Sequence, residues 1–453
     1  MNRALTVISG TLLFVLAGPV LAQASQAPVV FTGVSVIPMD REVVLANQTV
    51  VVENGRITYL GTGTAPAPEG AVSVDARGKF LMPAIAEFHA HVPSGSQIMH
   101  ARRALALYAL AGVATIRGML GVPYHLSLRD SLARGQVFGP RLITSGPSFN
   151  NNSVTSPDVA MRMVRDQKAA GFDLLKIHPG VPRVAFDSLA ATANRLGIPF
   201  SGHVPIEVSL DVALTSKYST VDHLDGFIEA MYNGPQPLTA QVNGFFGLGI
   251  VRQLDQSRFA PIIQRVRMSG VAMVPTQILM DNHASDATGD ELTSLPEFRY
   301  WVPQQVNGWR TNKNNLLAQA AVPRDQRQEF IALRRRFIKA LHDAGVLFLL
   351  GSDAPQWWNV PGFSAHRELG ALVAAGLTPF QALRTGTVNV ARFMGEEGRS
   401  GVVRLGARAD LLLLDANPLD DITNSLRING VVVNGRWVDP AERERMLGAL
   451  ATR

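Results

Sequence analysis

Residues 81–92 read LMPAIAEFHAHV, an apolar run that ends in two histidines separated by one residue. The run predicts a buried strand, and side chains two residues apart point to the same face of a strand. His89 and His91 can therefore reach one metal ion from the end of that strand. A pair of core histidines fits the same pattern, so these two residues alone do not establish a metal site.

The chain that follows alternates between short β-rich pieces and longer segments with helical spacing. After the first strand come GVATIRGML, PRLITSG, FDLLKIH, IPFSGHV, STVDHLDG, VAMVPTQIL and VLFLLGSDA. Strand–helix alternation predicts right-handed parallel units. Eight such units close into a (β/α)₈ TIM barrel, whose chemistry lies at the carboxyl ends of the strands. A polar stretch at about residues 280–340, between the seventh and eighth strands, predicts extra helices.

Both ends of the chain have a different sequence pattern, which is typical of β-strands without intervening helices. Residues 28 to about 80 read as short strands, with Asn54-Gly55 as a hairpin signal, and Asn434-Gly435 repeats that signal near the C-terminus. We therefore expect an α/β protein with a signal peptide at 1–24, a (β/α)₈ hydrolase barrel at 82–390, and a small β-sandwich domain built from 25–81 and 391–453.

The first residues predict export. A short basic start precedes the apolar run ALTVISGTLLFVLAGPV, and Ala22-Gln23-Ala24 supplies small residues at the spacing of a cleavage site. An uncleaved membrane anchor is the alternative, although the apolar run is barely long enough to span a bilayer. We expect a periplasmic or secreted protein with no stable membrane insertion once the leader is removed.

Composition restricts the function further. Hydrophobic residues make up 47% of the 453 residues and charged residues 17%, which is typical of a globular protein. The absence of cysteine excludes disulfides, thiolate metal sites and cysteine nucleophiles. The net charge of +6 is dispersed, and its densest run, Arg334 to Arg336, has apolar spacers of a helix. A solvated helix face explains that run better than a nucleic-acid patch, so no nucleic-acid partner is expected.

Four further polar residues mark the ends of predicted strands. Lys176 lies within FDLLKIH, while His203, His223 and Asp353 close the fifth, sixth and eighth strands. Imidazoles and carboxylates suit zinc and related divalent ions. Two such ions at close range need an anionic bridge. A lysine amine that reacts with carbon dioxide becomes a carbamate and supplies two oxygens; a salt bridge with an acid is the alternative for Lys176.

These motifs resemble those of the amidohydrolase superfamily. The matching segments are FHAH, LLKIH, SGHV, VDHLDG and LGSDAP, together with the C-terminal GVVRLGARADLLLLDANPL. The sequence is most similar to the binuclear-metal branch, which includes prolidase-like and imidazolonepropionase-related amidohydrolases. The resemblance covers essentially the whole chain after the leader.

The resemblance implies a binuclear site with two divalent ions, zinc being the expected metal. His89, His91 and Asp353 would bind one ion, and His203 and His223 the other. Carbamylated Lys176 and a hydroxide would bridge them. Asp353 would accept the proton of the hydroxide during attack on the amide and pass it to the leaving amine. The expected substrate is a small amide, such as a dipeptide or an N-acyl amino acid.

Two other functions remain open at this stage. A mononuclear deaminase or cyclic-amide hydrolase fits the same scaffold, but such relatives carry a glutamate three residues after the fifth-strand histidine. Here Ile206 occupies that position and Glu207 follows it. A non-catalytic exported protein that binds a metal or ligand is the second alternative, although it would not need the proton acceptor Asp353.

Candidate substrate-binding residues are less sharply indicated. Each also has an ordinary structural explanation: an ion pair for the arginine, an outer-shell or exposed role for the histidine, and core packing for the aromatic residues. A homo-oligomer is compatible with the sequence. The candidates are Arg117, His178, Tyr232, Trp357 and Trp358.

Overall fold

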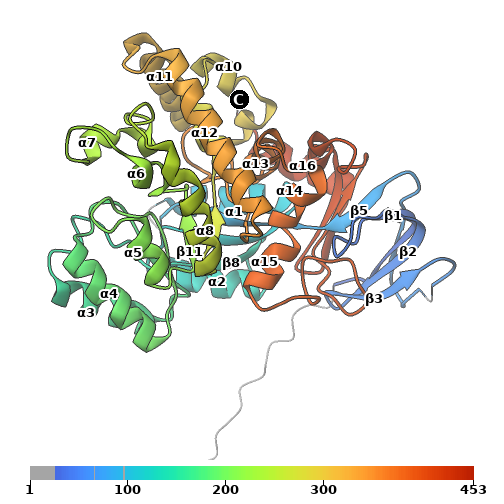
Figure 1. The fold of residues 1–453 in the computed structure, drawn as a ribbon. Helices are drawn as coiled ribbons and strands as arrows, with labels where there is room; N and C mark the ends of the chain where they lie inside the picture. Colours follow the sequence, from blue (N-terminus) through green and yellow to red (C-terminus); the bar gives the residue numbers. More distant parts are fainter. Residues whose placement is uncertain (1–25, 66, 95–96, 453) are drawn as a thin grey trace, which may run out of the picture.

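A computed structural model describes residues 26–65, 67–94 and 97–452 of the chain (Figure 1). The predicted signal peptide, residues 1–24, lies outside the described residues. Within the described ranges, no helix combines the length and the apolar character needed to cross a bilayer.

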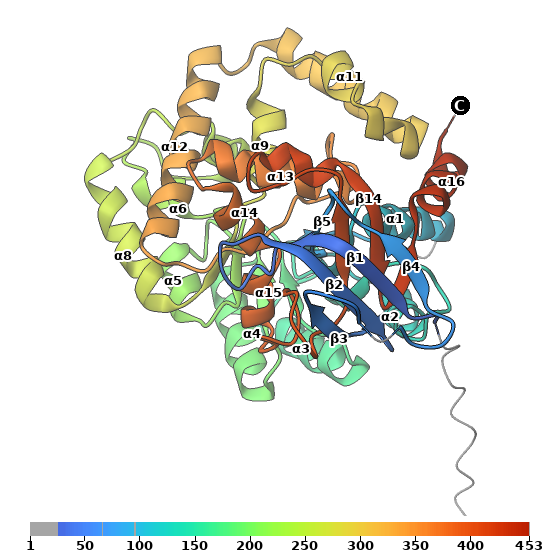
Figure 2. The same cartoon turned by 90° about the vertical axis from the view of Figure 1, so that its right-hand side faces the viewer.

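An eight-stranded sheet gathers strands from both ends of the chain. Its members are β1 (Val29–Val36), β2 (Leu45–Glu53), β3 (Arg56–Gly61), β4 (Val72–Asp75), β5 (Phe80–Pro83), β13 (Leu411–Leu414), β14 (Ile428–Val433) and β15 (Arg436–Val438). The strand order is β15-β14-β13-β5-β1-β2-β3, and β4 pairs with β1. The two ends of the chain meet where β13 pairs with β5 in antiparallel register. Figure 2 shows this composite sheet at the front of the molecule.

Two Asn-Gly pairs form the tight turns that the sequence predicts. Asn54 and Gly55 connect β2 to β3, and Asn434 and Gly435 connect β14 to β15. All four residues have positive φ, from 50° to 79°, as a type I′ turn requires. The strands that flank each turn pair in antiparallel fashion.

Strand β13 reads LLLL because both of its faces are buried. Leu411 and Leu413 pack with Phe31 in the core of the composite sheet. Leu412 and Leu414 belong to the larger core that the helices share. Alternate residues of a strand face opposite sides, so this run attaches the sheet to the rest of the molecule. The hydrogen-bond pairing joins the strands from both ends of the chain into one sheet. The formation of a β-sandwich domain by residues 25–81 and 391–453 stays a prediction.

Seven of the eight strands predicted in the middle of the chain are present, in two parallel sheets. The first contains β6 (Ile85–Ala90), β7 (Val113–Gly118) and β8 (Arg141–Thr144), in that order. The second contains β9 (Leu175–Ile177), β10 (Phe200–Gly202), β11 (Thr220–Asp222) and β12 (Ala272–Val274). The pairs within both sheets are parallel. This confirms the α/β class.

Isolated parallel bridges connect the edges of these two sheets. Ser145 pairs with Leu174 between β8 and β9, and Met273 of β12 pairs with Phe348. Ala90 of β6 pairs with Ala354. The eighth predicted strand, VLFLLGSDA, therefore lies between β12 and β6, although it forms bridges rather than a strand. No continuous ladder runs through all eight described segments, so a closed barrel is not established by the pairing.

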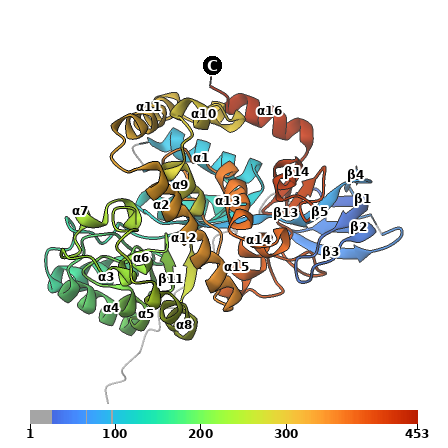
Figure 3. The same cartoon turned by 45° about the horizontal axis from the view of Figure 1, so that its top comes forward.

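Helices follow the parallel strands and surround them (Figures 1 and 3). Between β6 and β12 lie α1 (Ile98–Leu110), α2 (Tyr124–Ala133), α3 (Pro157–Ala170), α4 (Arg183–Leu196), α5 (Leu210–Thr215), α6 (Phe227–Met231), α7 (Ala240–Asn243), η2 (Phe245–Gly247), η3 (Gln256–Arg258) and α8 (Phe259–Ser269). After the eighth segment come α13 (Phe363–Ala374), α14 (Pro379–Thr385), α15 (Val388–Phe393), η5 (Ile422–Leu426) and α16 (Pro440–Leu450).

The extra helices predicted at about residues 280–340 are confirmed. They are α9 (Gln277–Ala284), α10 (Gly289–Thr293), η4 (Pro296–Tyr300), α11 (Pro303–Gln319) and α12 (Arg324–Asp343). In Figures 1, 2 and 3, α11 lies along the upper edge of the molecule. Buried Lys313 of α11 fixes this position because its Nζ donates to the backbone carbonyls of Asn282, His283 and Ser285 at the end of α9.

Candidate metal centre

Six side chains predicted as metal ligands lie together at the carboxyl ends of the parallel strands. They come from β6 and the residue after it, from β9, from the residues that follow β10 and β11, and from the eighth segment: His89, His91, Lys176, His203, His223 and Asp353. The parallel direction of the strands places their carboxyl ends at one edge, which is why residues so distant in sequence meet.

Short contacts connect the members of this cluster. Asp353 Oδ1 lies 2.6 Å from His91 Nε2 and 3.4 Å from His89 Nε2. Lys176 Nζ lies 3.4 Å from His89 Nε2. The ring of His223 is 4.4 Å from the rings of His89 and His203, measured between centroids. The structure therefore brings all six predicted ligands into one group.

Three members have the spacing of a metal site. One ligand atom each from His89, His223 and Asp353 lies within 4.8 Å of the others. Nε2 of His223 is buried without a hydrogen-bond partner in the described structure. An orphaned imidazole nitrogen beside a carboxylate fits a divalent ion that prefers nitrogen and oxygen ligands, as zinc does.

The Nδ1 atoms of these histidines contact residues that were not among the predicted site residues. Nδ1 of His89 lies 2.7 Å from Asp222 Oδ2, and Nδ1 of His203 lies 2.7 Å from Asp225 Oδ2. Such outer partners fix the orientation of metal-binding imidazoles. Both aspartates were visible in the motif VDHLDG, on either side of the histidine. Thr276, the corresponding partner of His223 at 2.8 Å, is remote in sequence and had no local signal.

Burial lowers the pKa of three imidazoles in the cluster, those of His89, His203 and His223. Desolvation, with Lys176 as the next cause, lowers the pKa of His203 to about 3. Burial also holds the pKa values of His89 and His223 well below their usual range. The neutral ring is the form that binds a metal ion. Burial lowers the pKa of Lys176 to about 8, which increases the fraction of free amine at neutral pH.

The backbone at this edge adopts unusual conformations. His223 and Asp353 have φ of 64° and 65°, in the left-handed region that non-glycine residues rarely occupy. Gly202, just before His203, has φ of 122°, and a Cβ there would lie 2.9 Å from Lys176 Cδ. The glycine in SGHV therefore leaves room for the lysine. Backbone strain of this kind is concentrated at functional sites.

Arg117 is buried inside the parallel strands rather than open to a substrate. Its Nε donates to the Phe88 carbonyl oxygen at 2.6 Å, and Nη2 donates to Thr220 Oγ1 at 3.0 Å. Nη2 also forms an ion pair with Asp222 at 3.3 Å. Because Asp222 contacts His89, Arg117 supports the cluster from behind. These contacts agree with the structural ion pair considered for Arg117. Protein groups engage its guanidinium, which is not left open to a substrate carboxylate.

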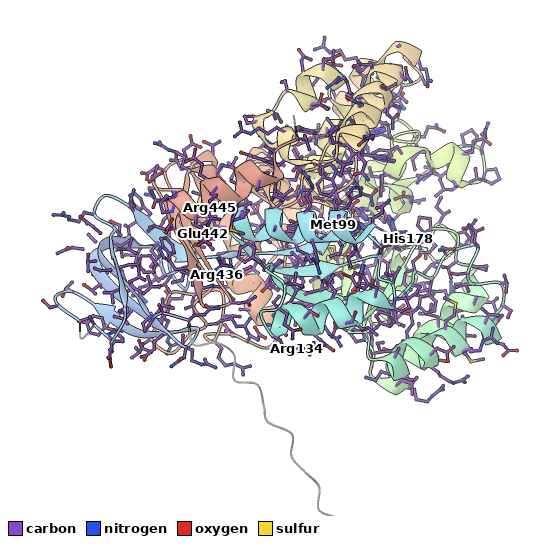
Figure 4. All side chains as sticks on the ribbon, turned by 180° about the vertical axis from the view of Figure 1, so that it is seen from behind. Met99, Arg134, His178, Arg436, Glu442 and Arg445 are labelled. Carbon is purple, nitrogen blue, oxygen red and sulfur yellow. The ribbon has the colours of Figure 1, made fainter. Side chains whose placement is uncertain are left out.

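His178 and Tyr232 occupy different positions relative to the cluster. The ring of His178 stacks on His203 with centroids 5.1 Å apart, and its Nδ1 is buried without a partner in the described chain. Burial lowers the pKa of His178 to about 2. Figure 4 shows His178 on the side away from the composite sheet. The hydroxyl of Tyr232 donates to the Gln236 carbonyl oxygen at 3.0 Å, within its own loop.

The two tryptophans after Asp353 have different environments. Trp358 is buried, and its Nε1 donates to the Trp309 carbonyl oxygen of α11 at 2.7 Å. This side chain therefore packs against the inserted helices. Trp357 is 36% exposed, and its ring lies 5.5 Å from that of Phe245. Phe245 and its neighbour Phe246 lie in a loop that contains none of the predicted substrate-binding residues.

Comparison with known proteins identifies similar sequences and folds. A family profile described as "Amidohydrolase family" matches residues 80–438. An N-substituted formamide deformylase of Arthrobacter pascens is 33% identical over 98 residues, covering 20% of this chain and 18% of that protein. An ochratoxinase of Aspergillus niger is 36% identical over 81 residues, covering 17% and 16% of the two chains.

Solved structures resemble this chain over nearly all of its length. A bottromycin amidohydrolase has a TM-score of 0.68 at 24% identity, with 93% of this chain and 90% of that chain covered. A Xaa-Pro dipeptidase with bound methionine has a TM-score of 0.66 at 15% identity, with 91% and 100% covered. At such identities the likeness concerns the fold. The chain aligns with only about a fifth or less of the length of the curated relatives.

Proposed function

Because the chain belongs to the amidohydrolase family over residues 80–438 and is a hydrolase, we propose that it cleaves the amide bond of a small organic molecule. Six potential metal ligands, Asp353 among them, converge at one place, and this convergence is the observation that carries the proposal. Support also comes from relatives whose names denote amide cleavage, including a formamide deformylase. Dipeptides, N-acyl amino acids and related amides are the candidate substrates.

The architecture proposed to hold this site is a (β/α)₈ barrel at 82–390 with a β-sandwich domain at 25–81 and 391–453. The three parallel bridges support closure, since one joins the ends of β8 and β9 and the other two involve the eighth segment, one with β12 and one with β6. The fold likeness to amidohydrolases of known structure supports the same arrangement.

Two divalent ions, zinc being the expected metal, would be held by the six clustered side chains. His89, His91 and Asp353 would hold one ion, and His203 and His223 the other. Carbamylated Lys176 would supply the shared anion: its free amine forms a bond to carbon dioxide and releases one proton. The lowered pKa of Lys176, about 8, favours that reaction. When bound, the ions would acidify a water molecule and polarise the substrate carbonyl.

Asp353 is the residue proposed to move the proton. Its backbone N–H donates to the His89 carbonyl oxygen at 2.9 Å, which fixes its carboxylate beside the histidines. Gln356 Nε2 donates to Asp353 Oδ1 at 3.4 Å. The carboxylate would accept a proton from the attacking water and deliver it to the leaving amine. His178, whose ring stacks on that of His203, would orient the substrate without adding charge, because burial lowers its pKa to about 2.

Replacing Lys176 tests the binuclear proposal. Lys176→Ala should abolish amide hydrolysis and reduce the bound metal to one ion or fewer per chain, because two cations at close range lose the anion between them. Metal content by elemental analysis and turnover of an N-acyl amino acid panel give the two readouts. Exposed Lys168→Ala is the matched control. A variant that keeps two ions and normal turnover would show that Lys176 has only a structural role.

We also propose that the protein is exported to the periplasm or secreted, with removal of residues 1–24. N-terminal sequencing of the exported protein should begin shortly after Ala24. A mature chain that starts at Met1 and fractionates with membranes would indicate an anchor instead.

A further inference from the structure

Four aromatic rings form a continuous surface beside the metal centre. We call this surface, made of Phe245, Phe246, His283 and Trp357, the aromatic wall. The rings of Phe245 and His283 stack with centroids 3.5 Å apart, and Phe246 and Trp357 lie 4.7 and 5.5 Å from Phe245. The residues come from η2, from α9 and from the loop after Asp353. Three separate segments therefore converge to build it.

The wall reaches the histidines that end β10 and β11. The ring of Phe246 is 5.2 Å from that of His223 and 6.0 Å from that of His203, nearly parallel to the latter. Phe246 has φ of 50° and ψ of 40°, a left-handed conformation inside η2. Bulky L residues rarely adopt it. The loop thus maintains a strained backbone that holds this ring against the two imidazoles.

Phe245 and Phe246 pack against the main core on one side, but the wall is only partly covered. Trp357 is 36% exposed, and Phe245 and Phe246 are half-buried. A core role would bury such large rings more completely. Partly exposed aromatic rings next to a polar cluster are typical of a binding surface with a few convergent polar groups.

The wall is also electrically neutral. Burial, with nearby Lys313 as the next cause, lowers the pKa of His283 to about 4, so the ring is uncharged at neutral pH. The ammonium of Lys313 already donates to three carbonyl oxygens. Arg334 donates to Gln277 Oε1 and to the carbonyl oxygens of His223 and Pro275. These two basic side chains are therefore engaged, and a carboxylate on the outer part of the wall would be desolvated without either of them to pair with it.

We propose that the aromatic wall is the subsite for an uncharged, preferably aromatic, substituent of the amide substrate. The inference rests on the proposed function and makes it more specific. The substituent would extend from Phe246 across Phe245 and Trp357 and stack on these rings. A carboxylate on this outer part of the wall would be desolvated without a basic side chain to pair with it, and would be rejected. Amides with a neutral aryl group on this side should be better substrates than amides with an acidic one.

Hydroxamates test the subsite without knowledge of the natural substrate. Each carries a metal-binding group, and only the attached substituent varies. Calorimetry on the zinc-loaded full chain would compare acetohydroxamate, benzohydroxamate, 4-carbamoylbenzohydroxamate and 4-carboxybenzohydroxamate. We expect the phenyl compound to bind at least about tenfold more tightly than the methyl compound, in line with one aromatic contact. The carboxylate should bind about tenfold more weakly than the size-matched carboxamide.

Substitutions in the wall should remove the phenyl preference selectively. Phe246→Ala and Trp357→Ala should each reduce the ratio of phenyl to methyl affinity at least about threefold, and this ratio cancels any effect of the substitution on metal binding that both compounds share. The second variant alters an exposed side chain, so loss of folding does not confuse the result. Phe138→Ala, which changes a half-buried phenylalanine outside the wall, is the matched control.

Three results would overturn the inference: equal affinity for methyl and phenyl, equal affinity for carboxylate and carboxamide, or an unchanged phenyl preference in both wall variants. Failure to hydrolyse any amide would count against the proposed function instead. In that case a phenyl preference that both variants reduce would still establish the wall as a binding surface.

Discussion

Thr276 illustrates how one hydroxyl can set the chemistry of a neighbouring imidazole. Its Oγ1 donates to the Pro275 carbonyl oxygen at 2.8 Å, so toward His223 it acts as an acceptor. His223 Nδ1, 2.8 Å away, must then carry the proton. This leaves the lone pair on Nε2, which is the buried nitrogen without a partner. The hydroxyl therefore selects the tautomer that a metal ion needs.

Thr276→Val should weaken metal binding while preserving side-chain shape. Without the acceptor, the Nδ1–H of His223 is left unsatisfied and the ring loses its fixed tautomer. Loss of such an outer partner typically costs 10–100-fold in metal affinity, which competition with a zinc chelator would measure. Thr385→Val is the control, since it removes another buried threonine hydroxyl, bonded to the Ala382 carbonyl oxygen. Equal zinc affinity in both variants would contradict the assigned role.

Residues that end strands were predictable from sequence, whereas residues brought in by loops were not. His89, His203 and His223 stand out because an apolar strand with a terminal imidazole is unusual. Phe246 has no such signal: its position depends on a left-handed conformation after α7 and on contact with Phe245, whose ring stacks on His283 of α9. Arg117 was visible, but only the fold shows that Asp222 engages it.

At the scale of elements, α13 is tied to two distant segments through one histidine. His366 Nε2 contacts the Ala111 carbonyl oxygen after α1 at 2.7 Å, and Nδ1 contacts Ser425 Oγ in η5 at 3.0 Å. A neutral ring satisfies both, with Nε2 as donor and Nδ1 as acceptor. Burial lowers the pKa of His366 to about 4, so the folded protein resists protonation at this site.

This histidine should make stability depend on pH. Its pKa is about 4 when folded and about 6.5 when unfolded, so the unfolded chain binds more protons as the pH falls below 6.5. The free energy of unfolding should therefore decrease from pH 6.5 towards pH 4, by about 1–2 kcal/mol between pH 7 and pH 5 from this group. Denaturant unfolding of the wild type and His366→Gln at both values would measure the difference.

In His366→Gln that part of the pH dependence should disappear, whatever the variant's overall stability. Thr385→Val, which removes a buried hydroxyl and no titrating group, is the control and should keep the wild-type slope. The same slope in His366→Gln as in the wild type would show that this ring is not the group responsible.

The positions of individual turns, strands and helices could be predicted from the sequence more closely than the closure of the parallel strands into a barrel. Both Asn-Gly turns, seven parallel strands and the inserted helices lie where the patterns indicated. The eighth segment differs in that it forms no regular strand. It contains Gly351, where an added Cβ would lie 2.7 Å from the His89 backbone nitrogen. Its backbone approaches β6 closely, and the backbone N–H groups of Phe88 and Asp353 donate the hydrogen bonds that join the two segments. Isolated bridges therefore replace a regular ladder.

At the scale of the whole molecule, the composite sheet joins the first and last parts of the chain. Strand β13 lies between β5 and β14, and its leucines face two cores. The C-terminal end is fastened elsewhere as well, since Thr452 N donates to the Arg299 carbonyl oxygen beside the inserted helices at 2.7 Å. Arg103 of α1 donates to the carbonyl oxygens of Tyr300 and Leu450. The strands from residues 29–83 and 411–438 therefore form one structural unit with the helices beside them.

Leu413→Ala should reveal this coupling. Leu413 is fully buried in the core of the composite sheet, and truncation of a buried leucine typically costs about 2–5 kcal/mol of stability. Because β13 pairs with β5, hydrogen exchange measured by mass spectrometry should rise in β1, β2 and β5 as well as in β14, despite their distance in sequence. Leu405→Ala, which alters a leucine that is 64% exposed, should leave exchange unchanged in all of these strands. If Leu413→Ala raised exchange only in β13 and β14, the N-terminal strands would be stable on their own, and the sheet would not couple the two ends.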